Sequence, residues 1–328
     1  MIASALGSYP RIGEGAEAQK LRRSIQKFQA GGITKEALRE VENQVVGEAI
    51  AEQEAAGLDW LTDGLVRWED GQTYFSDRLE GFKRGQLIRY FDTNTYYRQP
   101  VATGPVRWKA PISVEDWKFA QARTGKPVRP VVTGPYTLAR LSENTHYADF
   151  DSFAADVATA IHEEVRALEA AGAKAIQIDE PALVQDPADE PLAKRLLART
   201  LAGTKAEIWV ALYMGSPAKL LDRALEWAVA GLWLDAVSDG KALVERLASR
   251  PAAGSVKLGL GIVDARNTRL ESTDQLRETL GRVADRQGAE RLVATTSAGL
   301  EFLPRERAQE KLARLAQAAH TLGAGARS

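Results

Sequence analysis

Eight short runs of β-type apolar residues alternate along this chain with longer segments of helical spacing. The runs cover residues 2–7, 60–64, 128–133, 175–179, 208–213, 232–237, 256–263 and 292–296. Between them, apolar residues recur every three or four positions, as at Leu21, Ile25 and Phe28. Eight strands alternating with helices over 328 residues predict an α/β fold and a single (β/α)₈ barrel domain, with a doubly wound sheet as the alternative.

The segment between the second and third runs, about residues 65–127, is longer than a barrel loop requires. It is rich in aromatic residues, namely Trp68, Tyr74, Phe75, Tyr90, Phe91, Tyr96, Tyr97, Trp108 and Trp117. Within it, residues 87–94 read as a strand that enters a turn. We predict an insertion folded over the barrel mouth, as a hairpin that walls a binding site. The alternative is an aromatic satellite core under a long loop.

Charge and composition exclude several classes of function. With 43 basic and 44 acidic residues, the net charge is -1 and neither sign forms a long block, which argues against nucleic acid or an anionic membrane as a partner. No apolar run approaches a membrane span, and the first residues lack a signal-peptide layout, so we expect a cytoplasmic protein. The chain contains no cysteine, which rules out disulfides, a catalytic thiol and thiolate ligation of a metal.

The fourth run delivers two carboxylates to a strand end. Ile176 and Ile178 lead directly into Asp179 and Glu180, and Pro181 then stops the ladder. Barrels place their chemistry at the carboxyl ends of strands, and a carboxylate behind a buried strand is unfavourable unless something pairs with it. Asp179 is therefore a candidate catalytic residue. Glu180 is either part of the same site or bonded to an arginine in the barrel wall.

Polar residues also lie at the carboxyl ends of the other runs or directly after them. They are Ser8, Asp63, Thr133, Tyr213, Asp235, Asp264, Arg266, Asn267, Thr296 and Ser297. The barrel predicts that they converge on one face, although Asp63 and the 264–267 segment are equally compatible with turns and local salt bridges. We expect Asp179 and Asp235 to polarise substrate groups and Tyr213 or His146 to handle a proton. Of the three histidines, His146 is the one placed to reach the mouth.

Four arginines are predicted near the barrel mouth, namely Arg11, Arg67, Arg98 and Arg266. Their planar guanidinium groups would suit a polyanionic ligand. They are equally compatible with ion pairs to Asp59, Asp63 and Asp92 on the outside of the barrel.

Several segments together resemble one known family. They are Gly7-Ser8-Tyr9-Pro10-Arg11-Ile12-Gly13, the 53–59 segment Gln-Glu-Ala-Ala-Gly-Leu-Asp, Phe91-Asp92-Thr93-Asn94, Thr133-Gly134-Pro135-Tyr136-Thr137 and Ile178-Asp179-Glu180-Pro181-Ala182-Leu183. In this order they resemble the cobalamin-independent methionine synthases, which contain two related (β/α)₈ halves. The resemblance implies that this chain corresponds to one half. It also makes Asp92 and Asn94 candidate substrate-binding residues.

The two halves of that family differ in function. Residues 91–94 and 261–267 resemble the amino-terminal half, which carries no catalytic zinc. In the carboxyl-terminal half, a zinc ion held by His, Cys, Glu and Cys activates the homocysteine thiolate to accept a methyl group from methyltetrahydrofolate. Here Tyr213-Met214-Gly215 stands at the His-x-Cys pair, Asp235 near the glutamate, and Ala298 at the second cysteine. We therefore expect no zinc, and folate only as a co-substrate.

The amino-acid pocket of the family persists in part. Ser8 matches the serine that holds the homocysteine carboxylate, and Asp179 matches the aspartate that holds its amino group. Leu65 stands where a second carboxylate is expected, so an ammonium group would lose one of two counter-charges.

Three functions follow as alternatives. The first is a methionine synthase-like methyl or one-carbon transferase, with a methyltetrahydrofolate-type donor and a thiol or related acceptor. The second is a non-catalytic folate-binding subunit that partners a separate zinc-bearing chain. The third is a divergent lyase or hydrolase on the same barrel, because a fold does not fix a function.

Overall fold

The computed structural model describes residues 1–11, 19–252 and 254–325, so Ile12 and Gly13 of the first motif lie outside it. Its elements are β1 (Ile2–Ala3), α2 (Lys20–Gln29), α3 (Lys35–Ala55), α4 (Gly71–Ser76), β2 (Glu80–Arg89), β3 (Tyr96–Arg107), α5 (Val114–Gln121), β4 (Val131–Thr133), α6 (Pro135–Arg140), β5 (Glu143–Asn144), α7 (Phe150–Ala170), β6 (Ala175–Asp179), α8 (Pro181–Gln185), α9 (Glu190–Thr200), β7 (Glu207–Leu212), α10 (Leu221–Ala224), β8 (Gly231–Asp235), α11 (Ala242–Ser249), β9 (Lys257–Val263), α12 (Thr273–Gln287), β10 (Leu292–Thr296) and α13 (Arg305–Gly325).

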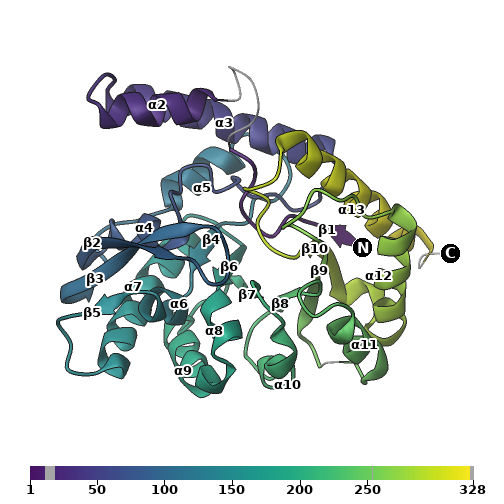
Figure 1. Ribbon diagram of the computed structural model, residues 1–328. Helices are drawn as coiled ribbons and strands as arrows, with labels where there is room; N and C mark the ends of the chain where they lie inside the picture. The colour runs from purple at the N-terminus through teal and green to yellow at the C-terminus, as the bar shows by residue number, and fades with distance from the viewer. Residues whose placement is uncertain (12–18, 253, 326–328) are drawn as a thin grey trace.

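Seven parallel strands form the main sheet, in the order β1-β10-β9-β8-β7-β6-β4 (Figure 1). Two isolated parallel bridges close the ring: Ser4, next to β1, pairs with Trp60, and Leu61 pairs with Val128, just before β4. The closed ring confirms the predicted (β/α)₈ barrel, and the doubly wound alternative is wrong.

The predicted second strand, residues 60–64, is reduced to those two bridges. The side chain of Gln53, buried in α3, occupies both backbone groups of Thr62: its amide donates to the Thr62 carbonyl at 3.0 Å and its carbonyl accepts from the Thr62 N–H at 3.1 Å. Gly64 and Leu65 then turn away with φ of 71° and 50°. A side chain thus takes the hydrogen bonds that a longer ladder would use.

Large and small residues interlock inside the barrel. Trp209 on β7 pairs in register with Gly231 on β8, and Trp233 on β8 pairs with Gly259 on β9. Each indole covers its glycine so closely that a methyl group added to the glycine would lie 2.4 Å or less from the ring. The two indoles also pack against each other, with centroids 4.6 Å apart. The barrel is therefore filled, which confines open space to its ends.

The helices cover the outside of the barrel, and α2 lies along α3 at one edge of the molecule (Figure 1). Helix α7 buries an apolar stripe that includes Phe153, Val157 and Ile161, as its spacing predicts. Among the residues described, no helix is long and apolar enough to span a membrane.

The segment at 65–127 folds into α4, the antiparallel hairpin of β2 and β3, and α5; β3 also pairs with the short β5. Glu164 of α7 fastens this segment to the barrel, since its carboxylate accepts hydrogen bonds from Trp108, Ile112 and Ser113 at 2.7–2.9 Å. The fixed segment brings the turn of the hairpin to the barrel mouth.

Candidate active site

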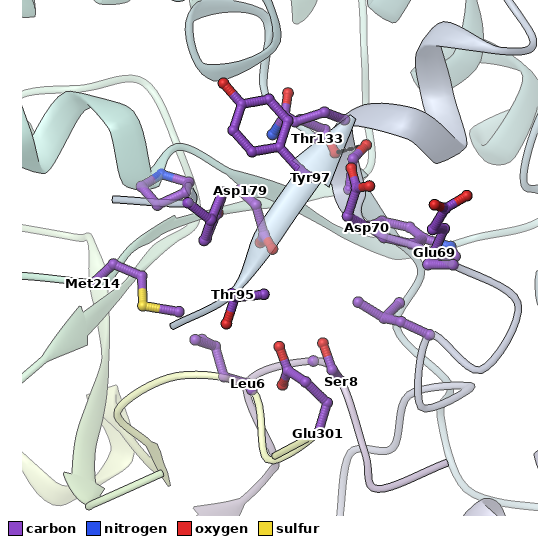
Figure 2. A pocket seen from close by; sticks show the side chains of 18 of the residues that line it. Leu6, Ser8, Glu69, Asp70, Thr95, Tyr97, Thr133, Asp179, Met214 and Glu301 are labelled. Carbon is purple, nitrogen blue, oxygen red and sulfur yellow. Dashed lines mark hydrogen bonds between the residues drawn. The ribbon is translucent and has the colours of Figure 1, made fainter. Parts of the chain in front are cut away.

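A cavity of about 380 Å³ opens at the carboxyl ends of the barrel strands (Figure 2). Of the predicted site residues, the structure brings Ser8, Arg11, Thr133, Asp179 and Tyr213 together in its wall. The turn of the β2–β3 hairpin supplies Tyr90 and Thr95 to the same cavity, and the start of β3 supplies Tyr96 and Tyr97. The role of the hairpin as the wall of a binding site stays a prediction.

Asp179 lies at the end of β6 and is 8% exposed. The amide of Gln177 donates to one carboxylate oxygen at 2.6 Å and the hydroxyl of Tyr213 donates to the other at 3.0 Å. Burial raises the pKa of Asp179 to about 7, although both hydrogen bonds and the charge of Arg129 oppose that rise. A carboxyl group that titrates near neutral pH can accept and return a proton.

The floor below Asp179 is built from buried polar side chains. Gln177 also donates to the Leu6 carbonyl at 2.9 Å. Arg129 donates to Ser4 Oγ and to the carbonyls of Ala5 and Leu6 at 2.9–3.1 Å, and its guanidinium lies 4.2 Å from the ring centroid of Trp233. These contacts fix the orientation of Asp179 and leave a positive charge beneath it.

Tyr213 follows β7 and lies between Asp179 and the hairpin. Its hydroxyl is hydrogen-bonded to Asp179, and the phenol oxygen of Tyr90 bonds to Tyr213 in turn. Burial and the neighbouring carboxylate raise the pKa of Tyr213 well above its ordinary value, so this phenol stays protonated and acts as a donor.

Glu180 is fully buried, but it faces away from the cavity. Its carboxylate accepts hydrogen bonds from the backbone N–H groups of Tyr136 at 3.1 Å and Thr137 at 2.7 Å, which are free donors in the first turn of α6. The alternative in which Glu180 bonds to an arginine in the barrel wall is wrong, because the first turn of α6 provides the donors instead. Glu180 therefore holds α6 against β6.

Two of the predicted carboxylates, those of Asp63 and Asp235, do not line the main cavity. Asp63 lines a second, much smaller cavity, and its carboxylate accepts from the Leu65 N–H at 3.0 Å. Both oxygens of Asp235 are bonded to its own loop, through the backbone of Val237 and Ser238 at 3.0 Å and the hydroxyl of Ser238. Each carboxylate stabilises the turn that follows its strand.

Three other predicted residues lie at the surface. Asp92 and Asn94 are exposed in the hairpin turn, where Asp92 pairs with Arg89 at 3.6 Å. His146 is exposed in the loop after β5, beside the ring of Tyr147, and does not reach the cavity. The proton-handling role predicted for His146 thus has no geometric basis.

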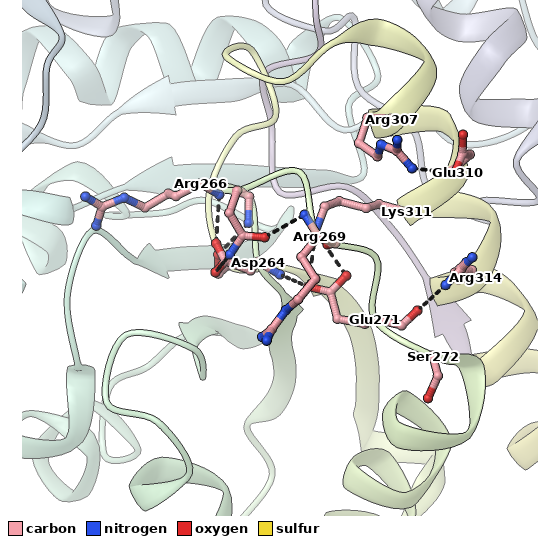
Figure 3. A network of polar contacts seen from close by, with 12 residues as sticks. Asp264, Arg266, Arg269, Glu271, Ser272, Arg307, Glu310, Lys311 and Arg314 are labelled. Atoms are coloured by element: carbon pink, nitrogen blue, oxygen red, sulfur yellow. Dashed lines mark hydrogen bonds and ion pairs between the residues drawn. The ribbon is translucent and has the colours of Figure 1, made fainter.

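Hydrogen bonds and ion pairs hold the loop after β9 in place (Figure 3). Asp264 accepts from the Arg266 N–H at 2.8 Å and from the Asn267 amide, while its own N–H donates to Glu271 at 2.9 Å. Glu271 in turn pairs with the buried Lys311 of α13 at 3.0 Å. The local-turn alternative therefore describes this segment. Ser297 is also structural: it accepts from the Ala265 N–H at 3.1 Å.

The four arginines do not form one basic surface. Arg67, whose side chain is 3% exposed, lies beside Asp116 and Glu42. Arg98 pairs with Glu69 at 3.4 Å, and the guanidinium of Arg266 points away from its network (Figure 3). Only Arg11 lines the cavity, where it donates to the Glu69 carbonyl at 3.2 Å.

The positions of the family's zinc ligands do not fit a zinc ion. Zinc requires about four N, S or O donors. Here Gly215 and Ala298 offer no side-chain donor, Asp235 is committed to its own loop, and Tyr213 is held by Asp179. Among the residues that the structure describes, no group of three or more His, Cys, Asp or Glu side chains is arranged to hold a metal.

The sequence analysis did not predict several residues that line the cavity. They include three carboxylates, Glu69, Asp70 and Glu301, and the exposed Phe302. Glu301 and Phe302 directly follow the Ala298-Gly299-Leu300 segment. A search about five residues beyond the end of this strand would have found Glu301 and Phe302, because the loop after β10 folds back over Ser8.

A (β/α)₈ barrel with a polar cavity at the carboxyl ends of its strands defines the class of TIM-barrel proteins that carry their sites at this face. Residues 1–321 match the family model described as "Cobalamin-independent synthase, Catalytic domain". The chain therefore belongs to the cobalamin-independent methionine synthase family.

Relatives match along nearly their whole length. Methionine synthase of Pyrococcus furiosus is 28% identical over 316 residues, covering 96% of this chain and 90% of the relative. Methionine synthase of Saccharolobus solfataricus is 29% identical over 310 residues, covering 94% and 91%.

Solved structures show the same fold. The B12-independent methionine synthase of Shewanella sp. W3-18-1, in complex with selenomethionine, superimposes with a TM-score of 0.84 at 22% identity, covering 99% of this chain and 98% of that one. A putative vitamin-B12-independent methionine synthase of Listeria monocytogenes gives 0.77 at 18% identity, covering 98% and 99%.

Proposed function

We propose that this protein is a methyl transferase that moves a methyl group from a methyltetrahydrofolate-type donor to a thiol or related acceptor without a zinc ion. Membership of the family supports methyl transfer in general. The donor, the acceptor and the independence from zinc are the parts that need testing.

The observation that carries the proposal is the pair of Asp179 and Tyr213 at the floor of the cavity. Zinc would otherwise lower the pKa of a bound thiol. In its place, the Asp179 carboxylate accepts the thiol proton, which its pKa of about 7 permits at neutral pH. The sulfur then forms a bond to the methyl carbon as the carbon–nitrogen bond of the donor breaks, and the donor nitrogen takes up a proton.

The match to the family favours an enzyme over a folate-binding subunit. The matching model is that of the catalytic domain, and the relatives have about the length of this chain. The buried Asp179 and the partly buried Tyr213 also form a hydrogen-bonded pair that a purely structural barrel mouth does not require.

The test is transfer of a ¹³C-methyl group, detected by mass spectrometry of the product. Methyltetrahydrofolate, as the mono- and triglutamate, is offered with homocysteine and a panel of other thiols, using protein treated with chelator and protein supplied with zinc. We expect transfer without added metal and its loss in Asp179→Asn. Asp151→Asn, an exposed carboxylate on α7, is the matched control and should retain the rate. Transfer that requires stoichiometric zinc, or no transfer to any thiol, would contradict the proposal.

A further inference from the structure

Arg129, which lies just before β4, is a cation buried inside the barrel. It is 2% exposed, and in the described part of the chain its hydrogen bonds go to a hydroxyl and two carbonyls, with no ion pair to a carboxylate. Its Nε atom is also buried without a hydrogen-bond partner among those residues. An unpaired charge in a protein core is unfavourable, and a neutral side chain would avoid that penalty. Packing alone therefore does not explain why this position carries a charge.

The hydrogen bonds of Arg129 explain a donor at this place, but not a cation. Its Nη2 atom donates to the carbonyls of Ala5 at 2.9 Å and Leu6 at 3.1 Å. Both residues follow Ser4, which forms the bridge to Trp60 of the shortened second strand. A neutral amide could donate to the same oxygens. The positive charge therefore acts on another group.

Asp179 is the carboxylate on which the charge of Arg129 acts. Gln177 connects the two residues, because its amide donates to the Leu6 carbonyl, which also accepts from Arg129, and to the Asp179 carboxylate at 2.6 Å. The guanidinium lies 4.2 Å from the ring centroid of Trp233, so apolar surface flanks it. In such surroundings a charge acts more strongly than it does in water.

The charges around Asp179 act in opposite directions on its pKa. Burial raises that pKa and Glu301 adds to the rise, whereas Arg129 opposes it. Arg11, the basic residue of the cavity wall, interacts with Glu301 instead. Other groups that interact with Asp179 are the hydrogen-bond donors Gln177 and Tyr213 and the titratable side chains of Glu180 and Tyr90. Arg129 is thus the cation that offsets the burial of Asp179.

We propose that Arg129 is a positioning residue whose charge holds Asp179 in the ionised form that accepts the proton of the acceptor thiol. Arg129 does not line the main cavity, so it stabilises the carboxylate without contacting the substrate. Burial lowers the pKa of Arg129 to about 9, and the guanidinium therefore stays charged at neutral pH. This inference rests on the proposed function, because it takes Asp179 to be the proton acceptor.

The test titrates Asp179 directly, without substrate, so it does not depend on turnover. The carboxyl carbons of aspartate are labelled with ¹³C, and the NMR signal that is missing in Asp179→Asn assigns this residue. Arg129→Gln keeps an N–H donor for the backbone carbonyls but removes the charge, whereas Arg129→Lys keeps the charge. We expect the pKa of Asp179 to rise by at least about one unit in Arg129→Gln and to stay within about half a unit in Arg129→Lys.

Two further variants separate charge from structure. Arg282→Gln, an exposed charge change on α12, is the matched control and should leave the Asp179 signal unmoved. Arg129→Met takes the place of Arg129→Gln if that variant does not fold, because a thioether packs well against the indole of Trp233.

The outcomes distinguish the inference from a structural role and from the proposed function. Melting temperatures that fall in the neutral variants without a rise in the pKa of Asp179 would overturn the inference and leave Arg129 a structural residue. An equal rise in Arg129→Lys would overturn it too, because the charge would then be irrelevant. A rise confined to the neutral variants supports it. If the wild type then transfers no methyl group, the action of Arg129 on Asp179 stands and the proposed function is refuted instead.

Discussion

Tyr213 donates a 3.0 Å hydrogen bond to Asp179 from the neighbouring strand end. Asp179 is in register with Ala211, so Tyr213, two residues farther along, lies on the same side of the sheet and leans back over it. The residue that follows β7 therefore supplies a hydroxyl to Asp179, at the position where the resemblance implies a metal ligand in the family's zinc-bearing half.

Tyr213→Phe should shift the pH dependence of methyl transfer. The Tyr213 hydrogen bond lowers the pKa of Asp179, so its loss raises that pKa further above 7. We expect the acid limb of the rate profile to move upward by roughly half to one pH unit, the equivalent of one hydrogen bond. The measurement is the rate against pH, with Tyr136→Phe, whose hydroxyl bonds Asp189 outside the cavity, as the control. An unmoved limb would show that Asp179 is not the titrating base.

Asp179→Asn should stabilise the protein at alkaline pH. The folded-state pKa of about 7 lies above the ordinary 3.8, so between those values the unfolded chain releases the proton and the folded protein keeps it. Stability therefore falls as pH rises through this window, by a few kcal/mol once fully ionised. The Asn variant lacks this loss. Melting temperatures at pH 5 and pH 8 should show a gain for the variant that is larger at pH 8; an equal effect at both would contradict the raised pKa.

The sequence predicts which carboxylates lie at strand ends, but not which of them face the cavity. Asp179 ends a five-residue buried strand, and Gln177 and Tyr213 hold its carboxylate at the cavity. Asp235 likewise ends a five-residue buried strand and Asp264 directly follows a strand, yet both turn onto backbone N–H groups two or three residues ahead. The short side chain of aspartate can either face the cavity or accept hydrogen bonds from its own loop. The conformation of the following loop determines which of the two occurs.

Gly134→Ala should weaken the attachment of α6. A methyl group at Gly134 would lie 2.2 Å from the Glu180 carboxylate carbon, so Glu180 would have to leave the N–H groups of Tyr136 and Thr137. We expect a loss of about 1–3 kcal/mol in urea unfolding, and a similar loss for Glu180→Ala. Because both changes break the same contact, the double variant should be little worse than either single one. Additive losses would mean that the two residues act independently.

The interior of the barrel was not predicted in detail. Alternation of apolar runs predicts strands, but it does not say which indole faces which glycine, since that depends on the register between strands far apart in sequence. Arg129 is a second case: a basic residue beside a strand reads as a surface charge, and here it is 2% exposed among tryptophans. Pairing across the ring, rather than local pattern, determines both.

Gly259→Ala tests that pairing directly. The added methyl would lie 2.0 Å from the ring of Trp233, which cannot retreat because Trp209 and Arg129 pack against it. We expect a loss of about 1–3 kcal/mol in chemical unfolding, typical of an overpacked core. Gly47→Ala, inside α3 with open space around it, should instead gain about 0.5–1 kcal/mol from helix propensity. Trp233→Leu in the Gly259→Ala background makes room for the methyl and should recover part of the loss. No recovery would place the strain in the backbone of β9 rather than against the indole.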